Sequence, residues 1–191
     1  MLQRRTLLTS ACIGAGLAVV GRMAHADDTV APTAPPPELA ALLPGAKVAG
    51  FTRMRFFGFD VYDAALWVGP DFRAGSFVQH LHALELTYLR GLSGRAIAER
   101  SLKEMRRGTA ANPEQDARWL GAMQNAFPDV NKGDRITGLH TPGSGARFWF
   151  NSQARSTIAD PEFSRQFFGI WLSPATSEPQ LRAALLARAT P

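Results

Sequence analysis

Apolar and polar residues alternate along two early segments of the chain, 47–57 (KVAGFTRMRFF) and 59–68 (FDVYDAALWV). A period of two with many Phe, Val and Trp residues is typical of β-strands. Phe57-Gly58 predicts a tight turn, so the two segments are expected to form a hairpin. Segment 84–89 (LELTYL) predicts another strand. Segments 135–140 and 146–152 flank a Thr-Pro-Gly-Ser-Gly turn and predict a second hairpin.

Four later segments have helical periodicity and a start signal; they begin at Ser93, Asn112, Asp160 and Ser177. In the second and third, a capping residue is followed directly by proline. The first is expected to end at Gly108, and the last, which opens with a capping box, near Ala189. These elements predict the α+β class, with a mostly antiparallel sheet covered by helices on one face.

The first 26 residues predict a signal peptide rather than part of the domain. They combine a basic start at Arg4-Arg5, an apolar run over 7–20 and a small-x-small site at Ala24-His25-Ala26. The apolar run is too short to span a membrane, so no membrane span is expected after cleavage. Gln3-Arg4-Arg5-Thr6 fits a twin-arginine signal, and an ordinary secretory signal with a chance arginine pair fits as well. We expect a bacterial protein that is periplasmic or secreted.

Residues 27–46 are rich in Pro and Ala and predict an extended tether. Residues 47–191 then form a single domain, long enough for a substantial core.

Charge and cysteine content narrow the function classes. The formal net charge of +5 includes Arg4, Arg5 and Arg22, and about +2 is left without them. So small a balance gives no support for a nucleic-acid partner. The single cysteine, Cys12, leaves with the signal peptide. The mature chain is therefore expected to contain no disulfide, thiol nucleophile or thiolate metal site.

Arg53 is the most informative candidate because it lies within an otherwise apolar strand. Its charge cannot be removed, so a half-buried arginine requires a partner or a ligand. Tyr62 on the next strand is a polar group that would face the same space. Together they predict a site for the carboxylate of an apolar ligand. The alternatives are that Arg53 pairs with Asp60 or Asp63, or that it lies exposed at a sheet edge. Arg55 is a second arginine of the same strand, and one of the two is expected to be solvated.

His80 and His82 would share one face of a strand, with His140 as a third candidate ligand for a metal. Polar residues at the start of a strand explain the pair more simply. The sequence therefore predicts no metal site and no cofactor.

Three segments together resemble the chalcone isomerase-like family, in a bacterial exported form. They are AGFTRMRFFGFDVYDAALWV, LELTYLRGLSGRAIAE and DPEFSRQFFGIWLSPATSEPQLRAALL. The resemblance covers about residues 47–187. It implies an open-faced β-sandwich of chalcone isomerase type, an antiparallel sheet with a helical layer and a ligand cleft between them.

The resemblance implies a ligand-binding set of Arg53, Tyr62, Glu104 and Gln166. Arg53 matches the family's ligand-facing arginine, and Tyr62 matches a position that is tyrosine in fatty-acid-binding relatives. Plant isomerases have a tyrosine and an asparagine where this chain has Ile97 and Glu104, and a threonine where it has Gln166. The catalytic set is thus incomplete, which favours the fatty-acid-binding branch.

Three functions follow from these residues. The first is non-catalytic binding of a fatty acid or similar apolar carboxylate. The second is an isomerase, an intramolecular lyase acting on a chalcone-like enone with Arg53 as electrophile and Tyr62 beside it. The third is a ligand-free interaction protein whose cleft is closed by aromatic side chains. The residue set favours binding over catalysis, and the sequence does not predict the oligomeric state.

Overall fold

The computed structural model describes residues 31–107, 109–110 and 112–191, so the predicted signal peptide lies outside the described residues. Its centre is a six-stranded antiparallel sheet in which every strand pairs with its neighbour in sequence. The strands are β1 (Lys47–Phe56), β2 (Phe59–Val68), β3 (His82–Tyr88), β4 (Arg135–Thr141), β5 (Gly145–Phe150) and β6 (Gln153–Ile158). The two predicted hairpins and the predicted third strand are confirmed.

The four predicted helices are present: α1 (Gly94–Met105), α2 (Pro113–Ala126), α3 (Pro161–Leu172) and α4 (Pro179–Leu185). Three begin as predicted, because the side chains of Ser93, Asn112 and Asp160 accept hydrogen bonds from backbone N–H groups of the first turn. The predicted capping box of α4 is wrong. Its N-cap is Glu178 without a side-chain bond, and the Ser177 hydroxyl donates instead to Glu104 on α1 at 2.8 Å.

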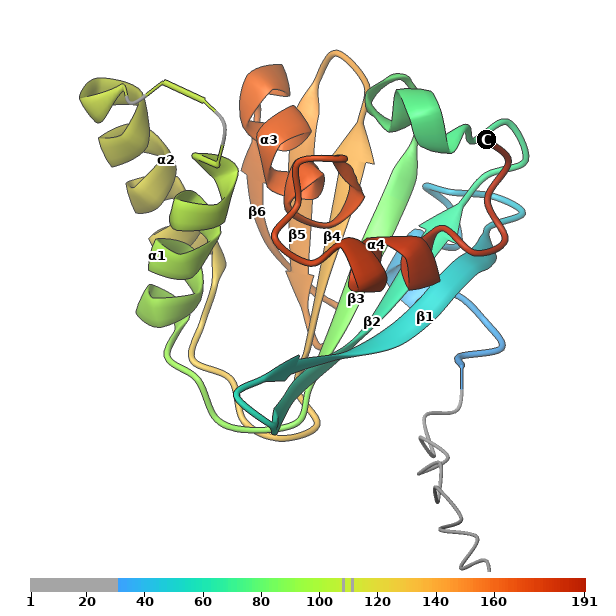
Figure 1. Cartoon of the computed structure of the whole chain (residues 1–191), viewed down its shortest axis with the longest axis horizontal. Coiled ribbons are helices and arrows are strands. Elements are labelled where there is room, and N and C mark those ends of the chain that lie inside the picture. The colour runs from blue at the N-terminus through green and yellow to red at the C-terminus, as the bar shows by residue number, and fades with distance from the viewer. Residues whose placement is uncertain (1–30, 108, 111) are drawn as a thin grey trace, which may run out of the picture.

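The helices pack on one face of the sheet, and the main core lies between these two layers (Figure 1). Aromatic side chains of α3 fill its centre. The ring of Phe167 contacts those of Phe163 and Phe168, and Phe163 and Phe167 also contact Phe148 of β5 edge to face. The α+β architecture with helices on one face is thus as predicted.

Gly50 on β1 lies where the backbone of α4 comes closest to the strand. A Cβ atom at this position would lie 2.1 Å from the carbonyl oxygen of Ala184 and 2.3 Å from that of Leu185. The C-terminal turn of α4 therefore rests directly on the backbone of β1, which only glycine permits. This contact fixes α4 over the first two strands.

The segment predicted to be a tether packs onto the sheet instead. Pro37–Leu39 forms a short 3₁₀ helix, η1, and the side chains of Leu39 and Leu43 are buried. They form a second apolar cluster with Trp67 and Leu139 on the face opposite the helices. The Glu38 carboxylate accepts from the Thr137 hydroxyl at 2.7 Å and pairs with Arg135 at 3.2 Å. The folded unit therefore begins before residue 47.

Besides η1, two elements were missed from the sequence: a short 3₁₀ segment, η2 (Ala74–Gln79), and the edge strand β6. Among the described residues, no helix combines the length and the apolar character that crossing a membrane requires.

Candidate ligand-binding site

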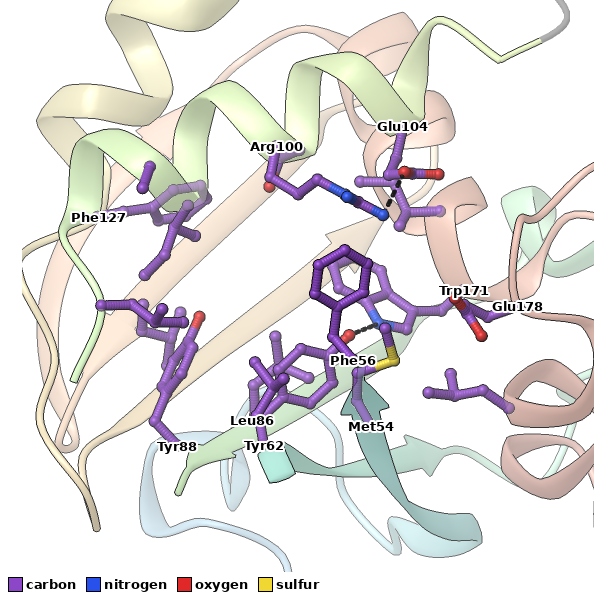
Figure 2. A pocket seen from close by; sticks show the side chains of 18 of the residues that line it. Met54, Phe56, Tyr62, Leu86, Tyr88, Arg100, Glu104, Phe127, Trp171 and Glu178 are labelled. Atoms are coloured by element: carbon purple, nitrogen blue, oxygen red, sulfur yellow. Dashed lines mark hydrogen bonds and ion pairs between the residues drawn. The ribbon is translucent and has the colours of Figure 1, made fainter. Parts of the chain in front are cut away.

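A cavity of about 330 Å³ lies between the sheet and three of the helices (Figure 2). Its floor comes from β1–β4, and α1, α3 and α4 close the opposite side. The walls are mostly hydrocarbon and aromatic, with Met54, Leu86, Ile97, Ile136, Phe167 and Trp171 among them. This volume is at the lower end of the range of about 300–1,000 Å³ that is usual for small-molecule sites.

Strand pairing explains which sheet residues face the cavity. Met54 on β1 pairs with Tyr62 on β2, and Tyr62 pairs with Tyr88 on β3. Directly paired residues point to the same face of a sheet, so the three side chains form a row across the cavity floor. The rings of Tyr62 and Tyr88 are 6.0 Å apart.

The two phenols are the polar groups of this floor. The Trp171 indole N–H donates to the Tyr62 hydroxyl at 3.1 Å, which leaves the phenol proton available to a ligand. Burial raises the pKa of Tyr62 to about 12, and burial also raises the pKa of Tyr88. Both phenols therefore stay neutral at physiological pH and can donate hydrogen bonds.

A charged pair from α1 lies at the rim. The Arg100 guanidinium contacts the Glu104 carboxylate at 2.8 Å, and the side chain of Arg100 is 47% exposed while that of Glu104 is 8% exposed. Glu104 also accepts from Ser177 at 2.8 Å and lies 3.7 Å from Arg107. Glu104 thus keeps two partners if Arg100 turns toward a ligand.

Arg53 does not line this cavity, which corrects its predicted place. Its Nε and Nη2 atoms donate to the two carboxylate oxygens of Asp63 at 2.7 and 2.9 Å, and Nη1 donates to Asp60 at 3.0 Å. This is the alternative in which Arg53 pairs with a neighbouring carboxylate. Arg55 also pairs with Asp60, at 2.7 Å, and is absent from the cavity lining as well.

A β-bulge explains the misplacement of Arg53. A two-residue turn at Phe57-Gly58 without a bulge would pair Arg53 with Tyr62 and place both on one face. The register shifts between Met54 and Arg55, so that Arg53 pairs with Asp63 and Met54 takes the place opposite Tyr62. A shift of one residue moves every following side chain to the other face.

The other predicted residues are divided between two cavities. Tyr62 and Glu104 line the cavity described above. Gln166 lines a second, more polar cavity of about 410 Å³, in which its amide nitrogen donates to Glu162 at 2.7 Å. Glu104 borders both cavities, but an acid there would repel a carboxylate ligand, so its contact with Arg100 is its clearest role.

Tyr88 and Arg100 were missed as site residues. The alternation of LELTYL places Tyr88 on the same face as Leu86, and Arg100 lies three residues after Ile97 on the same helix. These spacings could have indicated both residues once Tyr62 was assigned to the cavity.

The histidines form a buried pair rather than the cluster considered from the sequence. His82 and His140 are cross-strand partners with ring centroids 4.7 Å apart, while His80 lies before the strand and is only partly buried. Within the described residues, no group of three or more His, Cys, Asp or Glu side chains could hold a metal ion. Burial, reinforced by the proximity of His140, lowers the pKa of His82 to about 3.

Comparison with known proteins agrees with this architecture. Residues 47–187 match the model of the chalcone isomerase-like family, so the chain belongs to that family. An uncharacterized protein of Haemophilus influenzae is 29% identical over 105 residues, which are 55% of this chain and about half (51%) of that protein. The crystal structure of a fatty-acid binding protein of Arabidopsis thaliana superposes with a TM-score of 0.58 at 13% identity, covering 75% of this chain and 87% of the plant protein. At that identity the likeness establishes the fold.

Proposed function

We propose that this protein is an exported, non-catalytic binding protein for a fatty acid or a similar apolar carboxylate. The observation that carries the proposal is the apolar cavity between sheet and helices, with two neutral phenols on its floor and an arginine at its rim. The plant relative of the same fold, which is a fatty-acid binding protein by name, supports it. Export rests on the predicted signal peptide alone.

We propose Arg100, which lines the cavity, as the partner of the carboxylate in place of Arg53, which does not. The alkyl chain would lie among Leu86, Ile136 and Phe167, where burial of each methylene contributes about 0.8 kcal/mol. The carboxylate would accept from Arg100 and from a tyrosine hydroxyl. Because Glu104 retains Ser177 and Arg107, releasing Arg100 leaves no uncompensated carboxylate behind.

The two alternative functions have less support. The isomerase hypothesis placed its electrophile at Arg53, which lies outside the cavity. The interaction-protein hypothesis requires aromatic side chains to close the cleft. Phe56, Phe167 and Trp171 instead line an open cavity, and four other aromatic residues of the sheet and its first turn do not border it: Phe57, Phe59, Phe148 and Phe150.

Delipidated protein spanning residues 27–191 should bind long-chain fatty acids in titration calorimetry, with one acid per chain. Ala96, an exposed residue of α1 that lines the cavity, provides the test of location. Ala96→Trp should fill the cavity and reduce binding strongly without loss of folding. Binding by wild-type protein that Ala96→Trp leaves intact would place the acid elsewhere, and turnover of a chalcone would restore the isomerase hypothesis.

Arg100→Ala is expected to weaken fatty-acid binding about five- to tenfold, which corresponds to about 1–1.4 kcal/mol. The effect is modest because Arg100 is nearly half exposed and its interactions are screened by solvent. Titration of palmitic acid and its methyl ester would measure it. Wild-type protein should prefer the acid, and Arg100→Ala should lose this preference.

Arg95→Ala is the matched control for this prediction. Arg95 lies on the same helix, pairs with Glu99 at the same i,i+4 spacing, and is 79% exposed away from the cavity lining. Its replacement should leave both affinities unchanged. Equal losses in the two variants would mean a general effect of charge on the surface and not an anchor at Arg100.

A further inference from the structure

The turn between β1 and β2 exposes three aromatic side chains at one place. Phe56 is 45% exposed, Phe57 85% and Phe59 64%, and these are the exposed large hydrophobic residues found among the described residues. Single exposed apolar side chains are ordinary on a protein surface, but three on one turn form a local apolar tip. We define the aromatic tip as Phe56, Phe57 and Phe59.

The backbone of the turn does not favour phenylalanine. Phe57 and Gly58 both have positive φ, +48° and +80°, as in the two-residue turns that prefer Asn-Gly or Asp-Gly. A bulky side chain is disfavoured in this conformation, and the ring of Phe57 lies largely in solvent. Neither local conformation nor burial of the ring therefore accounts for Phe57, which indicates a role in contact with another molecule.

Arginines border the aromatic tip. The guanidinium of Arg90 lies 5.6 Å from the ring centre of Phe59, and that of Arg100 lies 5.3 Å from the ring centre of Phe56. Arg53 and Arg55 on β1 are paired with Asp60 and Asp63. Arg100 is paired with Glu104. The surroundings of the tip therefore contain four arginines and three carboxylates.

From these features we infer that the aromatic tip docks on an anionic lipid bilayer. Phe57 and Phe59 would enter the boundary between headgroups and acyl chains, and Arg90 and Arg100 would lie at the level of the lipid phosphates. A narrow apolar turn edged by cations matches that boundary, in which apolar and anionic layers lie next to each other. Figure 1 shows the β1–β2 turn at the end of the molecule where the β3–α1 connection also runs.

The aromatic tip lies next to the cavity rim, so docking of the tip would bring the rim to the membrane. Phe56 of the aromatic tip lines the cavity, and so do Arg90 and Arg100, which border the tip. A docked tip would therefore hold the cavity rim at the membrane surface, where an amphiphilic acid could pass between bilayer and protein. This exchange rests on the proposed function, whereas docking itself does not.

Vesicle co-sedimentation of ligand-free protein spanning residues 27–191 tests the inference. Wild-type protein should bind vesicles of mixed phosphatidylcholine and phosphatidylglycerol, bind phosphatidylcholine alone more weakly, and dissociate partly at high salt. The double variant Phe57→Asn/Phe59→Ser should partition at least about tenfold more weakly. Asn-Gly suits the turn, so the variant should fold, and Phe56 is kept because it lines the cavity.

Two further measurements separate the possible outcomes. Palmitate affinity should be unchanged in the double variant; if wild-type protein binds vesicles but no acid, docking stands and the proposed function fails. Sedimentation velocity reports self-association. Absence of vesicle binding by the wild type would overturn the inference, as would equal binding by the variant. An oligomer that the variant converts to monomer, without vesicle binding, would assign the tip to a second copy of the chain.

Discussion

Leu39→Ala should lower the free energy of unfolding by about 2–5 kcal/mol, the usual cost of truncating a fully buried leucine. The side chain of Leu39 is 0% exposed and packs in the second apolar cluster with Leu43, Trp67 and Leu139. Its removal would leave a void against the outer face of the sheet. Guanidinium unfolding of protein spanning residues 27–191, followed by tryptophan fluorescence, would measure the loss.

Leu42→Ala is the control, because Leu42 belongs to the same segment but is only partly buried at the border of the cluster. We expect a loss of less than about 1 kcal/mol there. If Leu39→Ala also cost less than about 0.5 kcal/mol, the segment would be detached in solution, as a tether would be.

Lowering the pH from 7.5 to 4.5 should destabilise the fold by about 2–3 kcal/mol through His82 alone. The unfolded state binds a proton near the ordinary pKa of about 6.5, whereas burial holds the folded pKa at about 3. Stability is therefore lost progressively as the pH falls below 6.5, at about 1.4 kcal/mol per unit, until the folded form is protonated near pH 3. Chemical unfolding at the two pH values measures the difference.

His82→Phe should remove this part of the pH dependence. The Nδ1 atom of His82 lies 2.8 Å from the carbonyl oxygen of His80, while its buried Nε2 atom has no hydrogen-bond partner in the described part of the chain. The ring contacts Phe72, Phe77 and Phe168, so a phenyl ring suits the site. The pKa of His140 is also lowered, by burial, and His140 is kept in both proteins, so the difference between them reports the part of the pH dependence that needs His82. An unchanged pH dependence in the variant would contradict the assignment to His82.

The architecture could be predicted from the sequence because its signals are local. Alternation along β1 and β2, and the capping side chains of Asn112 and Asp160, depend on residues within one turn or strand. The edge strand β6 was missed because five of its six residues, Gln153–Thr157, lie outside the core, so no apolar alternation marks it. Strand pairing, rather than burial, holds β6 in place.

The site was less predictable because it depends on register. The sequence identified Arg53 and Tyr62 but could not reveal a bulge that separates them onto opposite faces. Likewise, the Pro- and Ala-rich composition of residues 31–46 gave no sign that Leu39 would be covered by the sheet. Both errors concern how one segment packs or pairs with another, which the periodicity within a single segment does not encode.

Tyr62 and Tyr88 are the only two tyrosines of the whole sequence, and both face the cavity. The ultraviolet absorbance of tyrosine in this protein therefore comes entirely from residues that line the cavity. A ligand that accepts hydrogen bonds from the two phenols, or changes the polarity around their rings, would alter the spectrum directly. The chain thus contains an intrinsic optical reporter of occupancy, and loading could be followed in real time without a dye, a label or a substitution.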